Sequence, residues 1–331
     1  MRRSQKNLLE SKPLFCAIVG VLGMAAVAVA QRTQPQQPPK YNVQVNLVSL
    51  DVEVLDRRGN PVLGLDHKDF RVKENGRPME ISNFSWMSDR PVSLAFVLDT
   101  SAISSDKLVT LKRFIRELAS DLARGDLLCL YSFDSRDAYL ETDFTPDRML
   151  LWDALDNIGV PSGGSGGVMK EMFGGDPRTG LAIDMAIHQL RTTNYGKKAL
   201  LLISNRFRGL GPATVEHVQA SGCTLLTLGL DNKTALLVTL GGDRISKGQL
   251  MRQSGGREFS AGTGDMDGVC RAIAYSLKNY YAVGYLTDLD PAASKRRRIE
   301  VGVPGQPYKI NYRRTWGAEP GEPMPKRERM P

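Results

Sequence analysis

A carboxylate and two hydroxyls follow the most apolar stretch of the chain, and they are its clearest candidate for chemistry. Residues 92–98 are almost wholly apolar, and Asp99, Thr100 and Ser101 come directly after them. A run of this length and composition predicts a strand that is buried on both faces of a sheet. Ligands of open α/β sheets bind at the carboxyl ends of the strands. Oxygen donors at such a position suit an ion.

The segment that follows predicts a helix. Apolar residues recur with helical spacing between Leu108 and Leu122, and either Ser104 or Ser105 can cap the start of the helix. The oxygen cluster is therefore expected between the end of a buried strand and the beginning of a helix.

The sequence gives little support for catalysis. His67, His188 and His217 are the three histidines, and none stands in a zinc-binding spacing. Residues 163–167 match the GxSxG pattern, but a nucleophile elbow needs a buried strand before the serine and a helix after it. Here Pro and Gly residues surround the motif. We therefore predict a non-enzymatic protein, with a hydrolase as a remote alternative.

The first 30 residues have the pattern of a secretory signal. Four basic residues precede or flank an apolar run over residues 14–30, which ends in Ala28-Val29-Ala30. This combination predicts a cleaved signal peptide at residues 1–30 and a periplasmic or extracellular protein. The alternative is an uncleaved membrane anchor, since the run is close to the lower length limit for spanning a bilayer.

The charge of the exported chain argues against a nucleic-acid partner. Removal of residues 1–30 takes away four basic residues and one acidic residue, which leaves 40 basic and 35 acidic residues, a net charge of +5. This excess is mild. The densest basic cluster, residues 295–298, lies beside Asp288 and Asp290 and fits a solvated turn.

The three cysteines of the exported chain are expected to remain thiols. Cys129 and Cys223 fall in predicted buried strands, where a thiol behaves as a small apolar group, and Cys270 falls on a predicted helix. We expect no disulfide, although an exported protein could form one.

Strand patterns at both ends of the chain predict one small β-sandwich. A Pro-rich linker at residues 31–40 precedes alternating strands in residues 41–90, with a hairpin turn at Asn75-Gly76. Residues 288–315 hold two more alternating runs. Neither segment has enough strands to bury a face alone, so we expect them to combine. The tail at residues 316–331 has a disordered composition.

The central region, residues 91–287, alternates predicted strands with predicted helices. Such alternation predicts an α/β fold with a doubly wound, mostly parallel sheet that is covered on both faces. A Gly-rich loop at residues 159–178 interrupts it, and a strand at residues 280–286 is expected to close the set.

The spacing of Asp99 and Ser101 resembles the start of the DxSxS motif, the metal-ion-dependent adhesion site of von Willebrand factor A domains. On this resemblance, Thr179 matches the threonine ligand that opens a later helix. Two positions are altered: Ile103 stands for the second serine of the motif, and Asn205 for an aspartate at the end of a later strand. Ser104 is a substitute hydroxyl if the turn is shifted by one residue.

A wider resemblance covers most of the mature chain, from about Val45 to Tyr312. The segments DVEVLDRRGNPVLGL, FVLDTS and YYAVGYLTD occur in the order and spacing of the VWFA-related Acidobacterial domain proteins. This resemblance implies an exported protein with an A-type domain between β segments, and no known reaction. Our first hypothesis is a binding or adhesion module that engages a protein or surface polymer through the edge of the sheet.

The resemblance also implies a weakened site for Mg²⁺ or Mn²⁺ at Asp99, Ser101 and Thr179. Two alternatives stay open at this stage. The oxygen cluster is either a metal site or a hydrogen-bonded cap, and the protein is either a binding module or a metal-independent structural protein of the cell envelope.

Overall fold

The computed structural model describes residues 46–101, 103–134, 136–159, 178–204, 210–229, 247–260, 265–288 and 297–316. All of them belong to one compact unit, Val45–Pro331. The predicted signal peptide, the linker, the tail beyond residue 316 and nearly all of the Gly-rich loop lie outside the described residues. In the described part of the chain, no helix is long and apolar enough to cross a membrane.

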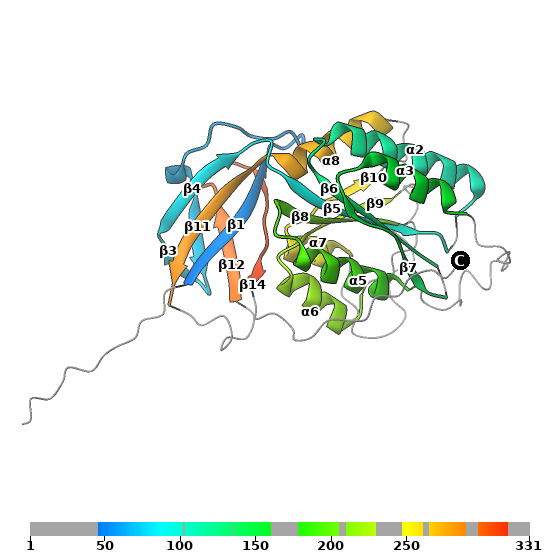
Figure 1. The fold of residues 1–331 in the computed structure, drawn as a ribbon. Coiled ribbons are helices and arrows are strands. Elements are labelled where there is room, and N and C mark those ends of the chain that lie inside the picture. The colour runs from blue at the N-terminus through cyan, green and yellow to red at the C-terminus, as the bar shows by residue number, and fades with distance from the viewer. Residues whose placement is uncertain are drawn as a thin grey trace, which may run out of the picture. The chain divides into compact units, whose positions relative to one another are not determined.

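A six-stranded sheet forms the centre of the α/β region, as the sequence predicts (Figure 1). Its order is β10-β9-β8-β5-β6-β7, and only the edge strand β7 runs antiparallel to its neighbour. The strands are β5 (Val92–Asp99), β6 (Leu127–Phe133), β7 (Ala138–Thr145), β8 (Lys197–Ile203), β9 (Thr224–Gly229) and β10 (Glu258–Ser260). Every residue of β5 is buried, which explains its unbroken apolar run.

Helices cover both faces of this sheet, and the alternation of side chains along β5 feeds two separate cores. Leu94, Phe96 and Leu98 face one apolar cluster, whereas Ala95 and Val97 face the other. The first cluster is covered by α2 (Ser105–Asp121), α3 (Arg148–Asn157) and α8 (Met266–Lys278), and the second by α5 (Thr179–Thr192), α6 (Pro212–Ala220) and α7 (Lys247–Ser254).

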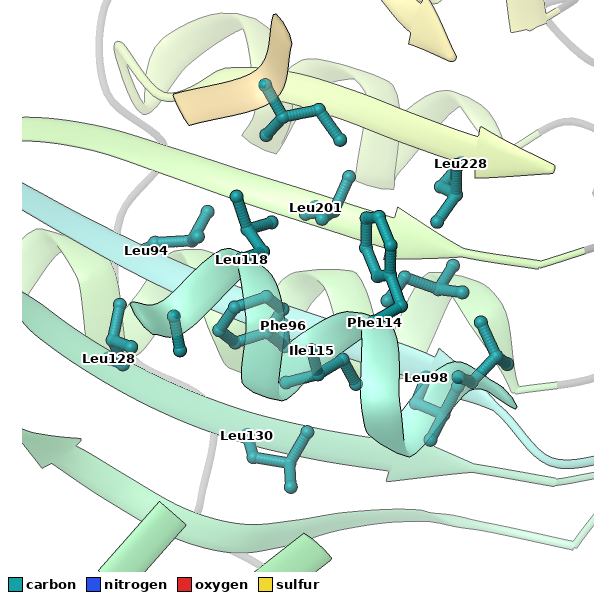
Figure 2. Packing of buried hydrophobic residues seen from close by; sticks show 14 of the residues in the cluster. Leu94, Phe96, Leu98, Phe114, Ile115, Leu118, Leu128, Leu130, Leu201 and Leu228 are labelled. Atoms are coloured by element: carbon teal, nitrogen blue, oxygen red, sulfur yellow. The ribbon is translucent and has the colours of Figure 1, made fainter. Parts of the chain in front are cut away.

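Figure 2 shows the packing of the first cluster, where Phe114, Ile115 and Leu118 of α2 lie over the leucines and phenylalanine of β5. All three helix side chains are fully buried. Each such side chain stabilises the fold by about 1.5–3 kcal/mol relative to an exposed one. This packing fixes the start of α2 against the carboxyl end of β5.

The terminal segments form the predicted β-sandwich (Figure 1). One sheet has the order β13-β1-β11-β4 and the other β14-β12-β2-β3, and their facing side chains share one apolar core. The elements are β1 (Asn46–Leu55), the short helix η1 (His67–Asp69), β2 (Arg71–Glu74), β3 (Arg77–Met79), β4 (Ile81–Met87), β11 (Tyr280–Thr287), β12 (Arg297–Gly302), β13 (Lys309–Asn311) and β14 (Thr315–Trp316). The predicted turn joins β2 to β3, with positive φ angles at Asn75 and Gly76.

The strand at residues 280–287 corrects the predicted domain boundary at residue 287. We expected it to close the α/β set, but β11 pairs with β1 and β4 of the sandwich. Its side chains Tyr281, Val283 and Tyr285 point into the sandwich core. The α/β region therefore ends with α8.

Polar contacts join the sandwich to the α/β region. Glu53 of β1 accepts hydrogen bonds from Arg257 Nη1 at 2.9 Å and from Asn311 Nδ2 at 2.8 Å. The backbone of Arg314 also donates to Gln253 O at 3.2 Å. Glu53 is buried, so its charge is compensated by a partner from each region.

Cys129, Cys223 and Cys270 are free and buried thiols. Cys129 lies on β6 and Cys223 directly precedes β9, and two strands separate β6 from β9 in the sheet. Burial raises the pKa of each thiol above its ordinary value. These groups behave as apolar core residues.

Candidate functional site

Asp99 lies at the carboxyl end of β5 with 7% of its surface exposed. Ser101 donates to Asp99 Oδ1 from its backbone nitrogen at 2.9 Å and from its hydroxyl at 2.5 Å. Ser204 donates its hydroxyl to Asp99 Oδ2 at 2.6 Å. Both carboxylate oxygens therefore accept hydrogen bonds, which offsets the cost of burying the charge.

The parallel strands bring these groups to one edge of the sheet. Asp99 is in register with Phe133 at the end of β6, and Leu98 with Ile203 at the end of β8. Thr100 binds Phe133 O through its backbone nitrogen at 2.8 Å and its hydroxyl at 3.0 Å. Ser204 follows β8 directly, so neighbouring strands end in hydroxyls that surround one carboxylate.

Thr179 is the first residue of α5 and is buried. The residue before it, Arg178, donates its backbone nitrogen to Asp134 O at 3.1 Å. Asp134 follows β6, so this bond holds the start of α5 at the same sheet edge as Asp99. The structure thus brings the three predicted residues Asp99, Ser101 and Thr179 to one edge, with direct contact between the first two.

The altered position Ile103 belongs to the packing of the fold. Its side chain is half-buried and packs against the apolar cluster between α2 and the sheet. Ser104, the substitute hydroxyl, is the N-cap of α2 and accepts from Lys107 N at 3.5 Å. The second altered position, Asn205, lies outside the described residues.

Two polar residues of this edge were missed in the sequence. Ser204 contacts Asp99 directly, and Asp134 is buried with Oδ1 accepting from Arg136 N at 2.7 Å and from Asp137 N at 3.0 Å. Both directly follow buried strands, which is the signal that identified Asp99. At the end of β8 the sequence pointed instead to Asn205, one residue beyond Ser204, and no candidate was assigned at the end of β6.

The oxygen ligands of the edge fit a hard divalent cation, and one of them, the Asp99 carboxylate, carries a negative charge. A serine hydroxyl that donates to Asp99 keeps two lone pairs, so Ser101 and Ser204 can both present oxygen to a cation beside the carboxylate. Mg²⁺ and Mn²⁺ take oxygen ligands of this kind. Within the described ranges, no group of three or more His, Cys, Asp or Glu side chains could hold a metal ion.

Among the described residues, His67 and His217 belong to no arrangement for nucleophilic catalysis. His217 Nδ1 lies 3.0 Å from Asp184 Oδ1, but Thr214 donates its hydroxyl to Asp184 Oδ2 and not to the imidazole. His67 pairs with the exposed Asp66. The GxSxG segment at residues 163–167 lies outside the described residues.

The chain is similar in fold to several solved structures. It has 17% identity to an aerotolerance-related membrane protein from Bacteroides fragilis, and the match covers 56% of this chain and 98% of that one with a TM-score of 0.40. It has 11% identity to a von Willebrand factor type A protein from Catenulispora acidiphila, over 85% of this chain and 76% of that one, with a TM-score of 0.41.

A third similar structure is proximal thread matrix protein 1 from the mussel byssus, with 11% identity and a TM-score of 0.42. The match covers 58% of this chain and 48% of the byssus protein, so the chain spans about half of that relative. No family model and no curated protein matches the chain. At identities between 11% and 17%, the likeness concerns the fold and assigns no function.

Proposed function

We propose that this chain is an exported, non-enzymatic binding module that engages a protein or surface-polymer ligand through the carboxyl edge of its six-stranded sheet. One observation carries this proposal: Asp99 is surrounded by the hydroxyls of Ser101 and Ser204 at the edge where α/β sheets bind ligands. The geometry offers no nucleophile and base pair in the described part of the chain, which favours binding over catalysis.

The proposed edge holds Mg²⁺ or Mn²⁺ weakly. Asp99 supplies the charge, and Ser101 and Thr179 supply neutral oxygens, as the resemblance to A-type domains implies. Ser204 adds a hydroxyl that the resemblance does not include. A divalent ion bound there would offer an open coordination position to an oxygen of the ligand. Ile103 offers no oxygen, and Asn205 keeps an oxygen but lacks the charge of an aspartate, so the affinity is low.

The proposal is tested by titrating Mn²⁺ into the full mature chain and following the free ion by electron paramagnetic resonance. The wild type is expected to bind weakly, Asn205→Asp to bind more tightly, and Asp99→Ala to bind no ion. The added carboxylate matters because attraction to a divalent ion is large at short range, even at an effective dielectric constant of about 20.

A matched control is Asp156→Asn, which removes an exposed carboxylate on α3 that pairs with Arg116. This variant should bind Mn²⁺ as the wild type does. Ile103→Ser is the less useful repair, because it removes an apolar side chain from the packing under α2. Equal titrations for the wild type, Asn205→Asp and Asp99→Ala would contradict the metal proposal.

The second candidate is a metal-independent structural or assembly role. The observation that favours it is the complete hydrogen bonding of Asp99, which stabilises the edge without an ion. Capture of ligands from an envelope extract by the immobilised chain separates the two candidates. Capture that needs Mg²⁺ supports the first, and capture that is unchanged both in EDTA and in Asp99→Ala supports the second.

The export proposal rests on the basic, apolar and Ala-Val-Ala pattern of residues 1–30. Mass spectrometry of the protein from its host should find an N-terminus at Gln31. A cytosolic protein that retains Met1 would contradict it.

A further inference from the structure

Two arginines stand beside the Asp99 edge. Arg136 lies in the turn between β6 and β7, and Arg178 directly precedes α5. Both side chains are exposed. The turn begins at Asp134, one residue after Phe133, whose partner in register is Asp99. The arginines therefore belong to the same end of the sheet as the candidate site.

Hydrogen bonds fix the two arginines relative to one another. The Asp134 carboxylate accepts from Arg136 N at 2.7 Å, and Asp134 O accepts from Arg178 N at 3.1 Å. Arg178 also donates its Nε to Arg136 O at 3.2 Å. One aspartate thus holds both backbones, and the side chain of Arg178 is directed over the turn that carries Arg136.

The carboxylates of this edge accept hydrogen bonds inside the protein, whereas the guanidinium groups of Arg136 and Arg178 pair with no carboxylate of the described residues, and Arg178 donates only to the backbone oxygen of Arg136. Asp99 accepts from two serines, and Asp134 Oδ1 accepts from two backbone nitrogens. Asp137 Oδ1 accepts from Ala138 N at 2.9 Å. Among the residues that the structure describes, neither Arg136 nor Arg178 forms an ion pair with a carboxylate. The two arginines therefore present hydrogen-bond donors, and a ligand that binds them must supply acceptors.

We propose that Arg136 and Arg178 form a docking surface for an acidic segment of a partner protein, and that this contact needs no metal. A guanidinium group binds a carboxylate through two parallel hydrogen bonds. Two guanidinium groups held by one turn suit two carboxylates that are close together in an extended peptide. The excess of basic residues in the whole chain acts in the same direction during approach.

This inference names the partner chemistry for the edge that the proposed function uses, but its test is independent of the metal. The probe is a fluorescein-labelled peptide of alternating Glu and Ser, and its control has Gln in place of Glu. Binding to the full mature chain is measured by fluorescence anisotropy in EDTA at low ionic strength. Binding of the Glu peptide and not of the Gln peptide is expected.

Arg136→Gln and Arg178→Gln should each weaken binding about tenfold, which is the value of one charge-assisted hydrogen-bonded contact. The two effects should combine in the double variant, and Arg→Lys at either position should give an intermediate loss because the charge remains while the fork is lost. At about 1 M salt, where the Debye length is about 3 Å, binding should weaken strongly.

The variants are expected to fold. Arg178 makes no side-chain cap bond to α5, and Arg136 is held by its backbone. A thermal unfolding measurement on each variant would check that it is folded. Arg113→Gln on α2 is the control, since it removes another exposed arginine, which pairs with Glu117 on its own helix. It should leave peptide binding unchanged.

Equal binding of the Glu peptide by the wild type and the double variant would overturn the inference, and so would no binding at low salt. Capture of dextran sulfate without capture of the peptide would also reject it and identify an anionic polymer as the partner. If Mn²⁺ titration fails while the peptide binds through the arginines, the metal proposal falls and this inference stands. If Mn²⁺ binds while the Glu peptide does not, this inference falls and the metal proposal stands.

Discussion

Replacement of the buried Asp126 should strongly destabilise the α/β region. It directly precedes β6 and has 1% of its surface exposed. Its carboxylate accepts from Val92 N at 2.9 Å, from Ala123 N at 2.9 Å and from Lys278 Nζ at 2.7 Å. One buried carboxylate therefore joins the start of β5, the loop that follows α2 and the end of α8.

Asp126→Asn keeps the shape of the side chain and removes its charge. The buried ammonium of Lys278 loses its closest counter-charge, and breaking a buried pair in this way costs about 3–5 kcal/mol. The amide has one oxygen for two backbone N–H groups, so one of them faces another donor. An unsatisfied buried amide adds about 1–3 kcal/mol, and we expect a total loss of about 5 kcal/mol.

The assay is urea unfolding of the mature chain, followed by circular dichroism and by tryptophan fluorescence. Asp89→Asn is the matched control, because Asp89 also faces Lys278 but is 89% exposed with an N···O distance of 4.0 Å. An exposed pair of this kind contributes less than about 1 kcal/mol. The double variant Asp126→Asn, Lys278→Gln should lose less stability than the sum of its single variants.

A loss in Asp126→Asn no larger than the loss in Asp89→Asn would refute this reasoning. It would mean that solvent or a local rearrangement compensates Lys278 at little cost. Equal losses in the double variant and in the sum of the singles would show that the two groups do not act as a pair.

Two further predictions concern the scaffold. Gly196→Ala should lower the free energy of unfolding by at least about 2 kcal/mol, because φ is +66° at this position and an added Cβ would stand 2.0 Å from Pro91 O. Thermal unfolding measures this loss, and an unchanged midpoint would contradict the prediction. Burial raises the pKa of Asp184 above 3.8. The folded protein then holds a proton that the unfolded chain releases, so the contribution of Asp184 to stability falls as pH rises from 3.8 through the raised pKa. Asp184→Asn should remove this fall from urea midpoints measured across acidic pH, and an unaltered pH profile would contradict it.

The sequence predicted those elements whose local residue pattern is compatible with only one secondary structure. The run at residues 92–98 is apolar on both faces, and only a strand between two cores needs that composition. The turn at Asn75-Gly76 was likewise predictable, because two consecutive positive φ angles select these residues.

The assignment of β11 failed because a strand pattern does not name its partner. Its alternating tyrosines and valines fit the edge of an α/β sheet or a face of a sandwich equally well. Its position after α8 favoured the first, while the structure pairs it with β1 over seven residue pairs. Only the long-range register resolves this choice, and no local property of residues 280–287 encodes it.

In the candidate site, too, contacts between residues close in sequence could be predicted, and contacts between distant residues could not. Asp99 and Ser101 are two residues apart and contact each other, so their spacing was sufficient to pair them. Ser204 contacts Asp99 across 105 positions of the chain. Pairing these two residues requires the parallel register of β5 and β8, together with the knowledge that β8 ends at Ile203 and not one residue later.

The hydrogen bonding of Asp99 has a consequence for any ligand of this edge. The carboxylate is stabilised by three donors without an ion, so the fold does not depend on a metal in the way that a site of unpaired carboxylates would. An ion that enters must bind the hydroxyl lone pairs and share Asp99 with both serines, which limits its affinity. Within the described residues, neither Arg136 nor Arg178 pairs with a carboxylate that an acidic ligand would have to displace. An acidic ligand would therefore gain its first attraction at Arg136 and Arg178, and the Asp99 edge would add selectivity after contact.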